Sequence, residues 1–200
     1  FTVRKTLPFD EVMSSLIKGF EAMVPAILIL TLAWTLKSMT DSLGAAEYVS
    51  GVVASSASEL QMLLPGIIFL VAGFLAFATG TSWGTFGILI PICIAVFPAA
   101  DPLRIISISA CMAGAVCGDH ISPISDTTIM ASAGAECKHV HHVSSQLPYA
   151  LTVAGVSFLT FIVAGFTHTW GMATSAIVSW IFGMLMLGLA LFYLNKRQKS

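Results

Sequence analysis

Two stretches of this chain carry no charged residue and are long enough to cross a lipid bilayer. Leu60 to Ala100 contains no Asp, Glu, Lys or Arg, and neither does Leu147 to Asn195. A transmembrane helix needs roughly 20 consecutive apolar residues, so each stretch contains at least one crossing. Composition agrees, because 56% of the residues are hydrophobic and only 10% are charged, whereas soluble domains average about a quarter charged. We therefore expect an all-α polytopic membrane protein in the cell membrane.

Apolar segments divide the chain into spans and connections. The first predicted span is Phe20 to Leu36. Residues 41–59 are too polar to cross and predict a short interfacial or connecting helix. A hydrophilic loop is predicted at 136–146. Two ordinary spans, at 148–166 and 170–194, close the chain, with a tight turn between them at 167–169.

The central apolar segments are short and interrupted by polar residues. The run at 62–78 is followed by TGTSWGT (79–85) and then by a second short run at 86–98, while the run at 103–117 is followed by GDHISPISDTT (118–128). Irregular backbone at membrane depth is tolerated only where it is buried in protein or lines an aqueous cavity. Many secondary transporters bind ions at such broken helices and consist of two inverted repeats. We therefore predict discontinuous or re-entrant helices that form one half of an inverted-repeat transporter.

The first interruption offers oxygen ligands. Gly80 and Gly84 permit backbone conformations that other residues avoid, and an unwound backbone exposes its carbonyl oxygens. Hard cations prefer oxygen ligands, so the hydroxyls of Thr79, Thr81 and Ser82 are candidate cation ligands. The alternative is structural, since small residues let helices approach closely while Thr and Ser bond back to the backbone.

The second interruption brings two carboxylates into the membrane. A charged side chain at the bilayer centre costs about 2.5–3.5 kcal/mol on insertion scales, so such residues are functional by default. Gly118 and Pro123 predict a break with Asp119 at the end of one helix and Asp126 at the start of the next, where exposed N–H groups favour negative charge. The candidate cation-binding or proton-carrying residues are Asp119, His120, Ser122, Ser125, Asp126, Thr127 and Thr128.

Two of these assignments have alternatives. His120 is either a third proton carrier, because imidazole changes charge near neutral pH, or a hydrogen-bonded partner of Asp119. Ser125 or Asp126 is alternatively an ordinary helix N-cap. A cap needs only one short polar residue, however, and this segment has two acids and four hydroxyls.

The cysteines and histidines suggest a different kind of site. Residue types that ligate soft or borderline metals gather in CKHVHH at 137–142. These residues lack regular ligand spacing and lie in the most hydrophilic internal stretch, which favours a solvated loop. The candidate ligands are Cys137, His139, His141 and His142. The other cysteines lie among apolar residues and predict no disulfide framework, and we expect no cofactor and no metal beyond sodium.

The few charges indicate topology. Lys196, Arg197 and Lys199 follow the last span directly, and Lys and Arg beside a span favour the cytoplasmic side. Residues 196–200 are therefore expected to be a basic cytoplasmic tail on a single transmembrane domain, 1–200. The chain begins without Met or signal-peptide character, which suggests a C-terminal fragment of a longer protein. It shows no Gly-x-x-x-x-Gly-Lys loop and no catalytic constellation, so we expect neither an enzyme nor an ATP-driven pump.

Several motifs, in order along the chain, resemble the NhaC-type sodium/proton antiporters. They are GFEAMVPAILILTLAWTL, FATGTSWGTFGILIP, GDHISPISDTTIMAS and HHVSSQLPYAL. The ordered set is more specific than any one motif and covers most of the chain. The resemblance implies inverted repeats with discontinuous helices, sodium/proton exchange in pH homeostasis, and an ion path through Asp119 and Asp126. It also implies that this chain is the C-terminal half and that the missing N-terminal half is its partner.

Three functions remain open at this point. The first is a secondary transporter that exchanges sodium ions for protons, and the second is a sodium- or proton-coupled exchanger of organic acids on the same scaffold. The third is a membrane metal-binding protein that uses Cys137 and the histidines. Small departures from the family pattern within IMASAGAECKHVHHVSSQ leave the branch of the family undecided. Expected partners are sodium ions, protons and the lipid bilayer, with a homo-oligomer as a further alternative and no nucleic acid.

Overall fold

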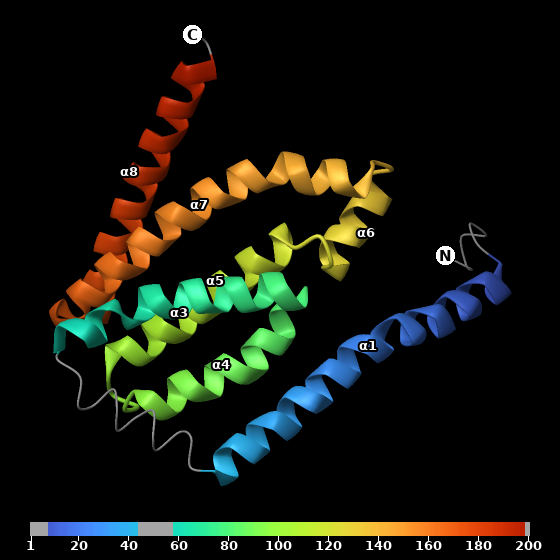
Figure 1. The fold of residues 1–200 in the computed structure, drawn as a ribbon, viewed down its shortest axis with the longest axis horizontal. Coiled ribbons are helices and arrows are strands. Elements are labelled where there is room, and N and C mark those ends of the chain that lie inside the picture. Colours follow the sequence, from blue (N-terminus) through green and yellow to red (C-terminus); the bar gives the residue numbers. More distant parts are fainter. Residues whose placement is uncertain (1–7, 44–57, 199–200) are drawn as a thin grey trace.

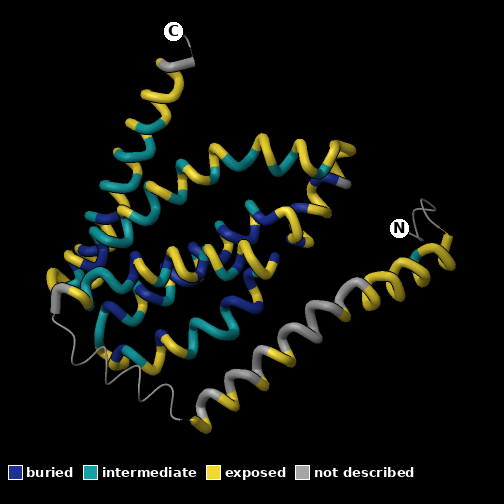
Figure 2. Tube along the Cα trace, viewed as in Figure 1, coloured by how far each residue is buried: buried dark blue, intermediate teal, exposed yellow. Residues whose placement is uncertain are grey.

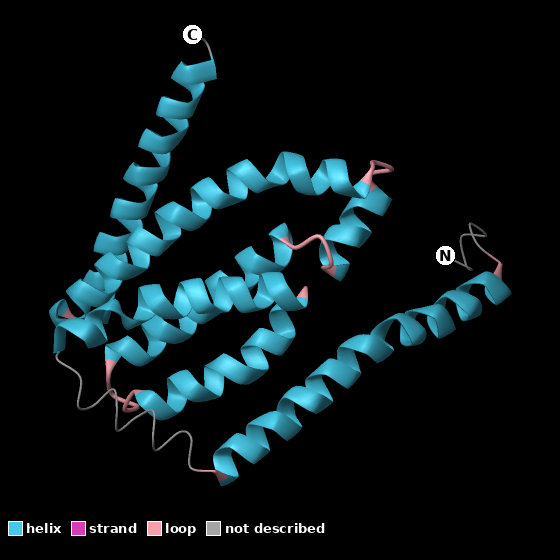
Figure 3. Ribbon diagram, in the orientation of Figure 1, coloured by secondary structure: helices cyan, strands magenta, loops and turns pink. Residues whose placement is uncertain are grey.

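The structure, a computed structural model, describes residues 8–43 and 58–198, and all regular elements in this part of the chain are helices (Figures 1 and 3). Helix bounds in chain order are α1 (Phe9–Ser42), α3 (Ser58–Thr79), α4 (Ser82–Val96), α5 (Pro102–Ile121), α6 (Asp126–Gly134), α7 (His139–Thr167), the 3₁₀ helix η1 (His168–Trp170) and α8 (Met172–Gln198). Among the described residues, 4 helices are long and apolar enough to cross a membrane: Leu60–Thr79, Pro102–Ile121, His139–Trp170 and Met172–Lys196. The prediction of an all-α polytopic membrane protein is confirmed.

Helix α5 lies at the centre of the arrangement and contacts α3, α4, α6 and α7. The buried core consists of small side chains from three helices, Ala72, Ala76, Cys93, Cys111 and Ala115. Figure 2 shows the buried residues concentrated on these central helices, while α8 presents mostly exposed or half-buried residues. The core is therefore built by close approach of backbones, as in membrane bundles generally, where water supplies no hydrophobic drive between helices.

Two glycines of α5 lie in close contact with the backbone of α3. A Cβ atom on Gly118 would overlap the carbonyl oxygen of Gly73, and one on Gly114 would overlap the carbonyl oxygen of Phe69. Gly114 and Gly118 have the G-x-x-x-G spacing that lets membrane helices pack closely. The prediction that Gly118 helps to break the helix is wrong, because α5 continues through it to Ile121 and the residue serves packing against α3.

The two interruptions are shorter than the sequence predicts. Helix α4 begins at Ser82, so of residues 79–85 only Gly80 and Thr81 lie outside a helix. The hydroxyl of Thr85 donates to the carbonyl of Thr81 at 3.2 Å, a bond within the first turn that is compatible with helix. The second break covers residues 122–125, between α5 and α6, and Figure 3 shows it as a loop. Discontinuous helices are therefore present at both predicted places.

The structure changes the bounds of several predicted spans and connections outside the two breaks. The span predicted from Phe20 to Leu36 lies inside the single helix α1. Most of the predicted connecting helix at 41–59 lies outside the described residues. Helix α7 begins at His139, so most of the predicted loop at 136–146 is helical; a helix longer than the bilayer can keep its His and Ser residues beyond the apolar core. The turn between the last two spans is η1, followed by Gly171 at φ 95°.

Candidate functional site

The two helix breaks lie against each other. Gly80 has φ 68°, and a Cβ atom placed there would come within 2.8 Å of the carbonyl oxygen of Ile124. The hydroxyl of Ser122 donates to the carbonyl oxygen of Phe77 at 2.7 Å. That oxygen lies in the last turn of α3, where helix carbonyls lose their intrahelical partners. Ser122 thus satisfies a carbonyl that the first break frees, as backbone at membrane depth requires.

Asp119 lies in the last turn of α5 and is 3% exposed. The hydroxyl of Ser125, also buried, donates to its Oδ1 atom at 2.6 Å. The Ser125 oxygen lies 2.5 Å from the hydroxyl oxygen of Thr127. Because Ser125 has one hydroxyl hydrogen and gives it to the carboxylate, Thr127 must donate to Ser125. Three predicted site residues therefore form one chain of hydrogen bonds that ends on Asp119.

The carboxylate of Asp119 forms no ion pair within residues 8–43 and 58–198, and Ser125 is its side-chain hydrogen-bond donor. Burying a charged carboxylate without a compensating charge is costly. A buried carboxylate of this kind is a candidate site for a proton or a cation.

Asp126 begins α6, so one carboxylate does stand at each end of the break, as predicted. Its side chain is exposed, and its Oδ1 atom accepts a hydrogen bond from the N–H of Thr127 at 2.8 Å. The structure thus brings Asp119 and Ser125 together and leaves the Asp126 side chain apart from them. The local bond resembles the structural role that the sequence left open for Asp126.

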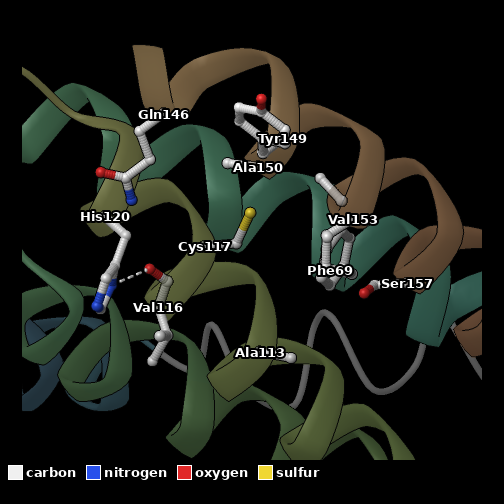
Figure 4. Close-up of a pocket in the computed structure, with 11 residues that line it drawn as sticks. Phe69, Ala113, Val116, Cys117, His120, Gln146, Tyr149, Ala150, Val153 and Ser157 are labelled. Carbon is white, nitrogen blue, oxygen red and sulfur yellow. Dashed lines mark hydrogen bonds between the residues drawn. The ribbon is translucent and has the colours of Figure 1, made fainter. Parts of the chain in front are cut away.

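His120 has a partner other than Asp119. Its Nδ1 atom donates to the carbonyl oxygen of Val116 at 2.8 Å, because a carbonyl can only accept (Figure 4). The alternative in which His120 is a hydrogen-bonded partner of Asp119 therefore finds no support among the described residues. The backbone carbonyl of His120 accepts a hydrogen bond from the hydroxyl of the buried Thr128 at 3.2 Å. The exposed ring of His120 lines a cavity of 390 Å³ between α5 and α7, and Figure 4 shows Phe69, Cys117, Gln146 and Tyr149 around the same cavity.

Two hydroxyls at the first break, those of Thr79 and Thr85, bond back to backbone carbonyls. Thr79 donates to the carbonyl of Leu75 at 2.8 Å. Thr81 is half-buried and Ser82 is buried at the start of α4. These contacts agree with the structural alternative for Thr79, namely a hydroxyl that bonds back to the helix.

A role for His139 outside a metal site was missed by the sequence reading. Its Nε2 atom lies 2.7 Å from the carbonyl oxygen of Pro123, within the second break. Its Nδ1 atom lies 3.1 Å from the hydroxyl of Ser132 on α6. No pattern in the sequence joins residues 123 and 139. In the described part of the chain, no group of three or more His, Cys, Asp or Glu residues is placed to hold a metal ion.

Comparison with known proteins gives consistent matches. The model of the Na+/H+ antiporter family matches residues 1–166. An uncharacterized protein of Haemophilus influenzae is 46% identical over 170 residues, covering 84% of this chain and 32% of the relative. The malate-2H(+)/Na(+)-lactate antiporter of Bacillus subtilis is 27% identical over 175 residues, covering 83% and 35%. An uncharacterized Na(+)/H(+) antiporter of Haemophilus influenzae is 32% identical over 113 residues, covering 54% and 24%.

These relatives are considerably longer than the chain. The chain spans about a third of the length of the first two relatives, 32% and 35%, where the resemblance implied a half. No solved structure gives a significant match.

Proposed function

The chain belongs to the Na+/H+ antiporter family, and we propose that it contributes the ion-exchange site of a secondary transporter that moves sodium ions and protons in opposite directions. Membership of this family points to a transporter rather than an enzyme. The observation that carries the proposal is the buried carboxylate of Asp119, which lies beside two helix breaks and has no ion-pair partner among the described residues.

Exchange follows from competition for this carboxylate. One carboxylate holds either a proton or a sodium ion, since two positive charges at one site repel each other. Binding on one side of the membrane and release on the other then couples the two fluxes, provided that the empty site rarely crosses. The hydroxyl oxygen of Ser125 beside the carboxylate is the kind of oxygen ligand that such a cation needs. The further candidate ligands of this proposal are Ser122, Asp126, Thr127, Thr128, Thr79, Thr81 and Ser82, with His120 as a proton carrier.

A second candidate function is exchange of organic acids coupled to sodium or protons. It is favoured by the similarity to the Bacillus subtilis malate-2H(+)/Na(+)-lactate antiporter, which extends over 83% of this chain. The cavity beside His120 offers 390 Å³ to an organic molecule, within the range of small-molecule sites. In this alternative Asp119 keeps its role in carrying the cation, and the organic acid is the second substrate.

The test measures exchange by the complete protein in everted membrane vesicles. A proton gradient is established, and its dissipation is followed after addition of sodium, malate or lactate. We expect sodium alone to dissipate the gradient in the wild type, and Asp119→Asn to abolish this at every sodium concentration. Asp126→Asn changes a candidate ligand outside the Asp119 hydrogen-bond chain and is expected to weaken exchange without abolishing it.

The outcomes separate the candidates. Dissipation only when an organic acid is present favours the second function. Normal sodium/proton exchange by Asp119→Asn would remove the site proposed here. Loss of exchange in Asp126→Asn and retention in Asp119→Asn would place the exchange site at the other end of the break.

A further inference from the structure

We infer that His139 is a positioning residue for this site: its ring fixes the break between α5 and α6, so that Ser125 faces Asp119. The inference rests on the proposed exchange at Asp119 and adds a residue from a different helix to it. His139 is the first residue of α7 and lies 16 positions along the chain from Pro123.

The His139 ring contacts both the break between α5 and α6 and helix α6 itself. Helix α6 has only 9 residues and packs against α5 and α7. Nε2 of His139 lies 2.7 Å from the carbonyl of Pro123, which stands between Ser122 and Ser125 in the break. Nδ1 lies 3.1 Å from the hydroxyl of Ser132, in the last turn of α6. One side chain therefore ties the break and α6 together to the start of α7.

The hydrogens in this arrangement can be counted. The carbonyl of Pro123 can only accept, so Nε2 must carry a hydrogen. Ser132 has one hydroxyl hydrogen and donates it to the carbonyl of Ile129 at 2.9 Å. Nδ1 can donate to the Ser132 oxygen while that bond is in place, and the Ser132 hydroxyl can instead donate to Nδ1. The ring and Ser132 are therefore hydrogen-bonded in both arrangements.

The ring is thus attached at two points. The hydrogen bond from Nε2 holds the carbonyl of Pro123 in the break, and the contact between Nδ1 and Ser132 holds α6. Among the described residues, Pro123 and Ser132 are the hydrogen-bond partners of the His139 ring. The positioning role therefore acts through these two contacts.

The test compares His139→Ala, His139→Gln and Ser132→Ala in the complete protein by the kinetics of sodium/proton exchange. We expect His139→Ala to raise the KM for sodium about tenfold, as loss of the hydrogen bonds of the ring implies, with a smaller effect on kcat. The Gln amide can replace the donor to Pro123, so His139→Gln should have a KM close to that of the wild type.

Ser132→Ala and a neighbouring histidine provide the controls. Ser132→Ala removes one of the two partners of the ring and should raise the KM less than His139→Ala does. His141→Gln changes an exposed histidine on the same helix that has no hydrogen bond from its ring, and its KM should equal that of the wild type. Should His139→Ala fail to accumulate, Ser132→Ala and the amide protection of His139→Gln still decide the question.

Hydrogen exchange of the backbone amides in residues 122–134 gives a readout that does not depend on sodium. Faster exchange in His139→Ala, with recovery in His139→Gln, supports the positioning role even if the wild type transports another substrate. The proposed function alone fails if wild-type vesicles show no sodium/proton exchange. Wild-type KM and wild-type amide protection in all three variants would overturn the inference, as would equal losses in His139→Ala and His139→Gln.

Discussion

At the scale of single residues, Asp119 depends on a partner from the other side of a helix break. Ser125 supplies the hydrogen bond to its carboxylate, and Thr127 in turn donates to Ser125. The oxygen atoms in this row of hydrogen bonds belong to the end of α5, the break and the start of α6. A small change in the path of residues 122–125 would therefore change the environment of the buried acid directly.

Substitution of Ser125 tests this arrangement. Ser125→Ala removes the hydroxyl that donates to Asp119, and we expect kcat/KM for sodium/proton exchange to fall roughly ten- to hundredfold, because a hydrogen bond to a charged group is worth about 1.5–3 kcal/mol. Thr127→Val is the control one step further along the chain and should have a smaller effect. A larger effect of Thr127→Val would show that Thr127, and not Ser125, serves the carboxylate. Exchange kinetics in vesicles measure both.

At the scale of elements, the packing of α5 on α3 places the two helix breaks side by side. Gly114 and Gly118 bring the backbones of the two helices into contact at Phe69 and Gly73. This contact places the end of α5 beside the end of α3, where Ser122 reaches the carbonyl of Phe77. The helix–helix contact and the adjacency of the two breaks are therefore one structural feature.

Gly118→Ala should separate the two helices. The added Cβ atom would overlap the carbonyl of Gly73, so α5 must shift, and overpacking of this kind typically costs about 1–3 kcal/mol. We expect a lower midpoint of thermal unfolding for the purified complete protein in detergent. Gly155→Ala on α7 is the matched control, since its Cβ atom would meet nothing within 4 Å. Equal midpoints for the two variants would contradict the proposed contact.

At the scale of the whole molecule, the described helices leave large apolar faces without protein partners. The span in α8 is only 6% buried and that in α7 is 17% buried, and Figure 1 shows α8 extending away from the other helices toward the C-terminus. Such faces suit contact with lipid or with further helices of a longer protein. We propose that the bilayer, the remaining part of the transporter and a second copy in a homo-oligomer are the partners that cover them.

The orientation of the chain follows from its last charges. Lys196, Arg197 and Lys199 lie immediately after α8 or at its end, so we expect the tail at 196–200 to lie in the cytoplasm. A reporter inserted after Ser200 that is active only in the cytoplasm should be active, and one that is active only outside should be silent. The opposite pattern would place the tail outside and reverse the proposed orientation.

The sequence alone determined the class of the protein and the places where its helices break. Hydropathy is a property of each segment, so the spans can be predicted one at a time. Pro123 and Gly80 restrict or free their own backbone, so the breaks can be predicted without knowing which distant residues lie nearby. The same local reasoning correctly put one carboxylate at each end of the second break. It failed at Gly118, because a helix-breaking glycine and a packing glycine look alike until the opposite helix is known.

Only the tertiary structure decided which residues meet. It placed Asp119 in the interior and left Asp126 exposed, although both stand in one polar segment. It also joined Ser122 to Phe77, 45 residues away, and His139 to Pro123, 16 residues away. These contacts cross between elements, and their geometry depends on how closely the helices pack. Periodicity and composition describe the elements one at a time and therefore cannot predict the geometry of contacts between them.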